Sequence, residues 1–155
     1  MATVGLHVRE ATSDDVPAVV AVFGRARSEA MPWLPVLHTH DEDLTHFGHA
    51  LTGDGHRAWV ATIDDAVVAF SAVGHGDLDH LYVDPDAQGR GVGAALFETV
   101  RAAFPDGFSF WVFTANVRAQ AFYERLGARP LYATDGADNE ERLPDLRYRW
   151  TPQGQ

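Results

Sequence analysis

The stretch that decides the fold reads LYVDPDAQGRGVGA and extends from Leu81 to Ala94. It combines the end of an apolar strand, a turn that contains Pro85, and a glycine-rich loop that opens a helix. Such a loop leaves backbone N–H groups unpaired at the positive end of a helix dipole, where phosphate binds well. Glycines let phosphate oxygens approach the backbone closely, and Arg90 can add a charge-assisted contact. The stretch therefore predicts a pyrophosphate-binding loop.

Two widespread phosphate-binding motifs do not fit this loop. The dinucleotide pattern G-x-G-x-x-G fails because Gly89, Gly91 and Gly93 form G-x-G-x-G instead. The loop also follows the fourth predicted strand, whereas the dinucleotide motif follows the first strand of its unit. The P-loop pattern requires a Gly-Lys pair, and all twelve basic residues of this chain are arginine. The loop therefore belongs to another class of phosphate-binding site.

The pattern that does fit is Gln88-x-x-Gly91-x-Gly93 after a strand that ends in Val-Asp-Pro. A second stretch, from Thr114 to Ala128, reads TANVRAQAFYERLGA, with an asparagine before a short helix that ends in Tyr-x-x-Leu-Gly. Together the two stretches resemble the GNAT family of acetyl-CoA-dependent N-acetyltransferases, where they form the pyrophosphate loop and a second signature. The chain departs from the family in having Ala128 where phenylalanine is usual.

The hydrophobic pattern predicts an α/β protein with elements in the order β-α-α-β-β-β-α-β-α-β-β. Two aspartates between the second and third strands predict a hairpin, and an acidic loop before the last strand is expected to be solvated. The expected strands are Leu6–Glu10, Ala58–Ile63, Ala66–Val73, Asp77–Val83, Phe108–Phe113, Ala128–Ala133 and Leu146–Trp150. The first expected helix follows the capping residues Thr12 to Asp15 and ends at about Glu29. The other three are expected from after Thr39 to Gly53, from Gly89 to Phe104 and from Asn116 to Leu126.

The resemblance implies the GNAT fold, which has a mixed, mostly antiparallel central sheet of about seven strands flanked by about four helices. It covers nearly the whole chain and is specific from Asp77 to Ala128. Since 155 residues is a typical length for one domain, we expect residues 1–155 to form a single N-acetyltransferase domain. A homodimer joined through edge strands is common in this fold, so the resemblance allows one here, although no residue pattern indicates it.

The composition excludes several kinds of partner and catalytic mechanism. The formal charge of −10 disfavours nucleic acid and anionic membranes as partners. The chain has no cysteine and no lysine, which excludes a thiolate metal site, a cysteine nucleophile and a Schiff base. We therefore expect direct acyl transfer without a covalent enzyme intermediate. The first ten residues show no secretory signal, and no apolar run approaches the length of a membrane span, so a cytoplasmic protein is expected.

The resemblance also implies roles for individual residues. The strand backbone around Leu81 and Val83 would pair with the acetyl and pantetheine amides, and Asn116 would contact the pantetheine arm or order the start of its helix. Tyr123 would lie near the thioester sulfur, where a phenol can donate a proton to the leaving thiolate. A packed aromatic at Tyr123 and a plain N-cap at Asn116 are the simpler alternatives. The expected acetyl-CoA contacts are Leu81, Tyr82, Val83, Gln88, Gly89, Arg90, Gly91, Val92, Gly93, Ala94, Asn116 and Tyr123.

The attacking amine must lose a proton, so a proton acceptor is expected near the acetyl group. Alternate strand residues share a face, which places Asp77 and Asp79 with the strand residues that follow unless a bulge intervenes. The resemblance supports a carboxylate or histidine base at one of these two positions. Some family members instead use a glutamate five residues before the asparagine, where this chain has Trp111. Asp79 or Asp77, directly or through water, is therefore the expected base, and the alternative is a solvated carboxylate that binds a cationic amine.

Eight histidines are the clearest excess in the composition. His38, His40, His46 and His49 lie within twelve residues and could ligate zinc, but their spacing matches no zinc motif, so no metal is expected. His80 is expected to be packed on the opposite face of its strand. The resemblance places the segment between the first two helices beside the acceptor amine. The expected acceptor contacts are Met31, Trp33, Leu34 and His38, with Pro35 and Leu37 beside them.

Two functions stay open from the sequence. The first is transfer of acetyl to a primary amine of a small molecule or a protein, through a ternary complex with acetyl-CoA. The second is a domain of the same fold that binds acyl-CoA as a sensor and has lost catalysis. The intact glycine loop, with Asn116 and Tyr123 in place, favours the enzyme. The acceptor itself is not predicted, since the residues that would select it lie in the segments that match least.

Overall fold

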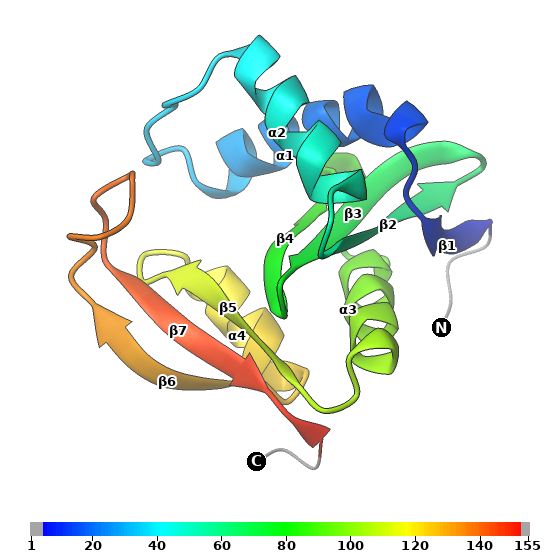
Figure 1. Cartoon of the computed structure of the whole chain (residues 1–155). Coiled ribbons are helices and arrows are strands. Elements are labelled where there is room, and N and C mark those ends of the chain that lie inside the picture. The colour runs from blue at the N-terminus through cyan, green and yellow to red at the C-terminus, as the bar shows by residue number, and fades with distance from the viewer. Residues whose placement is uncertain (1–4, 153–155) are drawn as a thin grey trace.

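The computed structural model describes residues 5–152, which form a seven-stranded sheet with helices on both faces (Figure 1). The strand order is β1-β2-β3-β4-β5-β7-β6. The strands are β1 Leu6–Glu10, β2 His56–Ile63, β3 Ala66–Gly74, β4 Asp77–Val83, β5 Phe108–Phe113, β6 Arg129–Thr134 and β7 Asp145–Trp150. The α-helices are α1 Val16–Ala30, α2 His40–Thr52, α3 Val92–Ala103 and α4 Val117–Arg125. The predicted order of elements and the predicted fold class are confirmed.

Local sequence signals explain most element boundaries. Thr39 caps α2, because its hydroxyl accepts the Glu42 N–H at 3.1 Å while the Glu42 carboxylate accepts the Thr39 N–H at 2.8 Å. The hairpin between β2 and β3 turns at Asp64 and Asp65, which both adopt positive φ, as tight hairpins require. The third helix begins at Val92 rather than at Gly89, because the intervening loop leaves the helical region of φ.

The central sheet divides between β4 and β5. Every neighbouring pair of strands is antiparallel except β4 and β5, which pair in parallel only at Asp77 and Ser109. Past this point the two strands diverge (Figure 1). Since β3 takes the other edge of β4, the β5-facing edge of β4 has no partner strand along most of its length. The divergence therefore leaves a row of backbone N–H and C=O groups available to a ligand.

Two apolar cores flank the sheet. On one face α1 and α2 pack against Val60 and Phe70 of β2 and β3. On the other face Leu96 and Phe97 of α3 pack with Phe110 of β5. β1 and β6 form the outer edges of the sheet, and the expected pairing of two copies through such an edge stays a prediction. Among residues 5–152, no helix is long and apolar enough to cross a membrane.

A bulge interrupts β4 near its start. Leu78 pairs with Val73 and His80 pairs with Ala72, so Asp79 is an additional residue in β4. The expected common face of Asp79 with the later strand residues is therefore wrong. Leu81 and Val83 pack with the α3 core, whereas the Asp79 carboxylate lies beside His56, whose ring contacts His49 of α2. An additional residue shifts the alternation of side chains, and this shift has no local sequence signal.

Candidate active site

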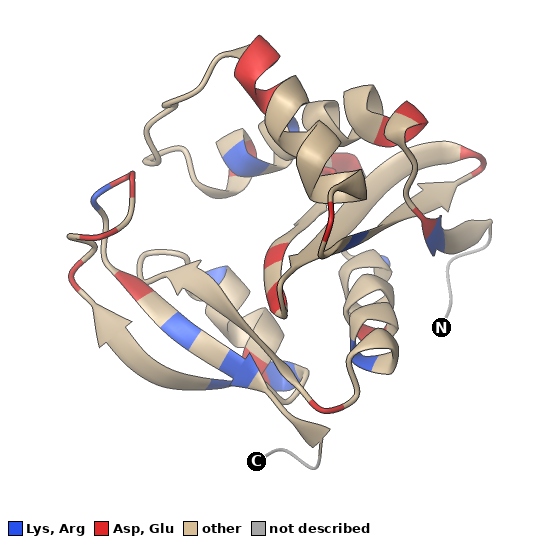
Figure 2. Cartoon of the chain, viewed as in Figure 1, with Lys and Arg blue, Asp and Glu red and all other residues tan. Residues whose placement is uncertain are grey.

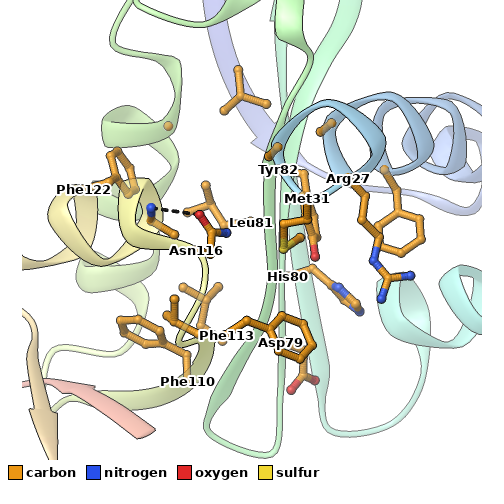
Figure 3. Close-up of a pocket in the computed structure, with 18 of the residues that line it drawn as sticks. Arg27, Met31, Asp79, His80, Leu81, Tyr82, Phe110, Phe113, Asn116 and Phe122 are labelled. Carbon is orange, nitrogen blue, oxygen red and sulfur yellow. Dashed lines mark hydrogen bonds between the residues drawn. The ribbon is translucent and has the colours of Figure 1, made fainter. Parts of the chain in front are cut away.

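A cavity of about 1020 Å³ occupies the space where β4 and β5 diverge. This volume is typical of a site for a sizeable small molecule. Figure 3 shows β4 passing between Asn116 and Phe122 on the α4 side and Met31 and Arg27 on the α1 side. The cavity therefore joins the glycine-rich loop at the start of α3 to the loop between α1 and α2, which are the two regions that the sequence predicts for the two substrates.

The glycine-rich loop forms one end of the cavity, which we call the phosphate end after the ligand that the sequence predicts there. Gly89 and Gly91 have φ values of 78° and 77°, which side chains disfavour, and Gly91 is the residue that caps α3. A Cβ at Gly93 would lie 3.1 Å from the Phe122 ring, so this glycine allows α3 and α4 to approach closely. The backbone N–H groups in the first turn of α3 therefore follow a turn that has no side chains at Gly89 and Gly91, and this arrangement suits a phosphate ligand.

The residues around the loop hold it in place. Asp84 forms an ion pair with Arg25 of α1 and accepts the Asp86 N–H at 3.0 Å. The Gln88 amide donates to the Val83 carbonyl at 3.3 Å and accepts from Arg118 at 3.4 Å. Arg118 is a cavity residue that the sequence reasoning missed, although its place two residues after Asn116 in the second signature could have indicated it.

We expect the conformation of the loop to control acetyl-CoA binding. Replacing Gly91 with alanine forces a side chain into a left-handed backbone, which costs about 1–2 kcal/mol, and should weaken coenzyme A binding about tenfold. Gly24→Ala is the matched control, because a Cβ there meets nothing within 4 Å and the residue lies inside α1. It should leave the Kd unchanged and stabilise the fold by about 0.5–1 kcal/mol. Calorimetric titration with coenzyme A tests this, and equal Kd values for both variants would contradict it.

Most of the expected acetyl-CoA contacts line the cavity, and Arg90 does not. Asn116 serves as the N-cap of α4, since its side-chain oxygen accepts the Ala119 N–H at 3.2 Å, and it also faces the cavity (Figure 3). The two interpretations of Asn116 are thus compatible. The expected contacts found in the lining are Leu81, Tyr82, Val83, Gln88, Gly89, Gly91, Val92, Gly93, Ala94, Asn116 and Tyr123.

Tyr123 lies on α4 at the wall of the cavity, between aromatic rings. Its ring centroid is 4.5 Å from that of Phe110 and 5.0 Å from that of Phe122. Burial raises the pKa of Tyr123, so its phenol stays protonated at neutral pH. Among residues 5–152, none forms a hydrogen bond with this hydroxyl. Tyr123 is therefore a packed aromatic whose protonated hydroxyl belongs to the cavity wall.

The two candidate bases have different surroundings. Asp77 accepts a hydrogen bond from Arg147 of β7 at 2.9 Å and does not line the cavity. Asp79 lines the cavity, and its side chain lies at the lower end of β4 in Figure 3. Desolvation of its carboxyl group, followed by the negative charge of Asp77, raises the pKa of Asp79 to about 6. The geometry thus favours Asp79, which can take up and release a proton near neutral pH.

The acceptor end of the cavity differs in part from the expectation. Met31 and His38 line it, whereas Trp33 and Leu34 do not. Leu34 is buried in the protein, and the Trp33 ring packs edge-on against Phe113 at 5.9 Å. Predicting the lining failed here because an irregular segment has no periodicity from which to infer the direction of each side chain.

Two ion pairs join the α1 side to the loop between β6 and β7, and we call them the clasp. His38 lies 2.9 Å from Glu140, and Arg27 lies 2.9 Å from Glu141. Figure 2 shows the acidic residues of this loop and of the first turn of α2. The expectation of a solvated acidic loop is therefore wrong for Glu141, whose side chain is only 11% exposed. The loop closes one side of the acceptor end.

We expect the His38 half of the clasp to weaken as the pH rises. The Glu140 carboxylate raises the pKa of His38, so the ion pair is complete below the ordinary histidine pKa and is lost as the pH rises through the raised value. Hydrogen–deuterium exchange should show lower protection of residues 135–144 at high pH. Glu140→Gln should remove this pH dependence, while the Arg27–Glu141 pair stays unchanged in the variant. Protection that changes equally with pH in both proteins would contradict the clasp.

The remaining histidines separate into two groups. His80 packs against Phe47 with a centroid distance of 4.8 Å, and its Nε2 lies 3.0 Å from Nε2 of His46. Burial lowers the pKa of His80 to about 3, so its ring is neutral and packed, as expected. His49 instead contacts His56. Within the described part of the chain, no three metal-ligating side chains come together to hold a metal ion.

Comparison with known proteins identifies the class. Residues 54–127 match the family described as acetyltransferase (GNAT) domain. The mycothiol acetyltransferase of Rhodococcus opacus (strain B4) is 35% identical over 114 residues, which are 70% of this chain and 36% of that protein. The peptidyl-lysine N-acetyltransferase YjaB of Salmonella typhimurium is 36% identical over 70 residues, which are 44% of this chain and 48% of that protein. This chain therefore spans less than half the length of both curated relatives.

The fold is shared with a solved acetyltransferase. The crystal structure of the PaiA N-acetyltransferase from Thermoplasma acidophilum in complex with coenzyme A matches with a TM-score of 0.73 at 12% identity, covering 94% of this chain and 98% of that chain. The chain thus has the fold of an acetyltransferase, built here as a mixed sheet that divides between β4 and β5 beside a glycine-rich loop. The chain belongs to the GNAT family of acetyltransferases, which confirms the predicted family.

Proposed function

We propose that this protein is an acetyl-CoA-dependent N-acetyltransferase that transfers acetyl directly to a primary amine. The observation that carries the proposal is one cavity lined by a glycine-rich loop, the edge of β4 that has no partner strand, the Asp79 carboxylate and the Tyr123 hydroxyl. The coenzyme A complex of the PaiA enzyme, which has the same fold, supports acetyl-CoA as the donor. The N–H groups at the start of α3 would bind the pyrophosphate.

The edge of β4 would bind the rest of the donor. Its backbone groups from Leu81 to Val83 have no partner strand on the cavity side. The amides of the pantetheine arm can pair with them as an added strand would, which supplies hydrogen bonds without requiring particular side chains. This arrangement would place the thioester between β4 and α4, with Asp79 and Tyr123 on the cavity wall beside it.

The proposed reaction is a direct displacement. An amine that arrives as an ammonium ion first releases one proton to solvent. The lone pair of the neutral nitrogen then forms a bond to the thioester carbonyl carbon, and Asp79 accepts the proton that this nitrogen loses. The carbon–sulfur bond then breaks, and the sulfur leaves with the electron pair. The Tyr123 hydroxyl donates its proton to this thiolate, which gives the free thiol of coenzyme A, and the phenolate takes up a proton from solvent water when the products leave. The chain offers no cysteine or lysine for an acyl-enzyme intermediate, so both substrates would be bound together.

The acceptor end favours a positively charged amine. Glu42, Asp43 and Asp79 line it in addition to the two glutamates of the clasp, while Phe23 and Met31 supply apolar surface. An ammonium group with an attached apolar chain suits such a wall. The curated relatives are named for a peptidyl-lysine substrate and for mycothiol, so the acceptor panel should contain lysine peptides as well as small amines.

Turnover of acetyl-CoA with this panel tests the proposed function. Release of free thiol can be followed with a thiol reagent, and the protein adds no background because it contains no cysteine. We expect acetyl-CoA turnover that depends on the added amine, with calorimetry showing binding of coenzyme A. Tight binding of acetyl-CoA without turnover of any amine would overturn the proposal and establish the acyl-CoA sensor instead.

A further inference from the structure

A group of three histidines, His49, His56 and His75, lies beside Asp79. A Cβ at Gly74 would lie 2.7 Å from Asp79 Oδ2 and 2.8 Å from His56 Nε2, so this glycine makes room for both groups. Both atoms therefore lie on the same side of Gly74, near enough to each other for one water molecule beside this glycine to bridge them. His56 belongs to β2, and its position opposite Gly74 follows from the register of β2 and β3.

The orientation of the His56 ring is defined by its other nitrogen. Nδ1 lies 3.0 Å from the Asp54 carbonyl oxygen, which can only accept, so Nδ1 carries the hydrogen. In the neutral ring, Nε2 therefore presents a lone pair to the side where Asp79 lies. His56 is thus oriented to accept a proton from the direction of Asp79.

Two further rings connect His56 to the protein surface. Its ring centroid is 4.6 Å from that of His49 and 5.1 Å from that of His75. Both of these histidines are exposed, whereas His56 is half-buried. None of these three histidines lines the cavity, so the group extends from beside Asp79 to bulk solvent at the start of β2.

We propose that His56 is the proton-relay residue through which Asp79 returns to its ionised form. The proposal rests on the proposed function, in which Asp79 takes a proton from the amine. Asp79 is exposed in the unliganded protein, and in the proposed ternary complex the two substrates would cover its cavity side. The Asp79 carboxyl group then gives its proton to the bridging water, and this water gives a proton to His56 Nε2. The resulting imidazolium loses a proton to bulk solvent beside His49 and His75, which leaves Asp79 ionised and His56 neutral.

The charges around the pair are consistent with this route. Besides His56, the groups that act on Asp79 are Asp77 of β4, His75 of the turn after β3, and Arg147 of β7. His49 of α2 faces His56. The pKa of Asp79 is raised to about 6, so its carboxyl group both takes up and releases a proton near neutral pH.

Replacing His56 tests the relay, with acetyl-CoA and the best amine of the panel as substrates. His56→Ala and His56→Gln should each lower kcat about tenfold or more, with the KM for acetyl-CoA unchanged. Added imidazole should restore the rate of His56→Ala, because it can accept the proton in the vacated space. His40→Ala is the matched control, since this exposed histidine does not line the cavity, and it should retain the wild-type kcat.

A purely structural role for His56 would not produce rescue by imidazole. Wild-type kcat in both variants, or a loss that imidazole does not restore, would overturn the relay while leaving the proposed function intact. A nuclear magnetic resonance titration tests the relay separately from the proposed acetyltransferase function, because it requires no turnover. The His56 ring signals should show a second inflection from Asp79 that disappears in Asp79→Asn, and its absence from the wild type would also overturn the relay.

Discussion

Replacing Asp79 with asparagine is expected to lower kcat by about 10²–10⁴-fold, the usual contribution of a general base. Asparagine keeps the size of the side chain and removes its ability to take a proton from the amine. The affinity for coenzyme A should not change, because the phosphate loop lies at the other end of the cavity. Steady-state kinetics and calorimetric titration of the same preparations measure the two quantities.

The pH profile provides an independent signature for Asp79. The wild-type rate should rise as the pH increases through about 6, the raised pKa of Asp79, and this limb should be absent from Asp79→Asn. The folded-state pKa lies above the unfolded value, so ionisation of Asp79 disfavours the fold as the pH rises from about 4 to 6 and beyond. Asp79→Asn should therefore melt at a higher temperature than the wild type at pH values above this range, which separates lost activity from misfolding.

Asp77 offers the matched control. It is bound to Arg147 outside the cavity, so Asp77→Asn should retain most of kcat. Because the charge of Asp77 helps to raise the pKa of Asp79, this variant should shift the limb of the pH profile to lower pH. A large loss in Asp77→Asn together with normal activity in Asp79→Asn would reverse the assignment of the base.

Removing the hydroxyl of Tyr123 is the other large effect that we expect. Tyr123→Phe preserves the ring contacts with Phe110 and Phe122 but removes the proton donor, so kcat should fall about 10²-fold or more with the fold intact. The deficit should shrink with an acetyl thioester whose thiol is more acidic, because a better leaving group needs less assistance from a proton donor.

Tyr132→Phe serves as the comparison, because Tyr132 is 54% exposed on β6 and does not line the cavity. It should match the wild type with both thioesters. A Tyr123→Phe protein with an undiminished rate would leave Tyr123 as a packed aromatic only. Loss of activity accompanied by a lower melting temperature would instead indicate that the cavity wall had rearranged.

Much of the fold follows from local sequence. The glycine-rich loop before α3, the capping box at Thr39 and the Asp64-Asp65 turn each satisfy a backbone requirement within a few residues. Apolar periodicity is likewise a local property, so the order of strands and helices could be predicted from it. The phosphate end of the cavity was predictable for the same reason, because one continuous stretch of chain forms it.

The acceptor end could not be predicted in the same way. Met31 lines the cavity and Leu34 does not, although both lie in one short irregular segment. The clasp joins His38 to Glu140, more than a hundred positions along the chain, and nothing in either stretch indicates the other. Such contacts depend on how distant elements pack, and periodicity carries no information about them.

The amino-acid sequence by itself determined the family, the succession of elements and the pyrophosphate loop, because these depend on backbone conformation and apolar spacing over short stretches. Only the tertiary structure placed Asp79 at the cavity wall and Asp77 outside it. The bulge in β4 turns Asp79 toward His56 and the cavity, while β7 brings Arg147 to Asp77. The register of two strand pairs sets these positions, and register is a property of the assembled sheet.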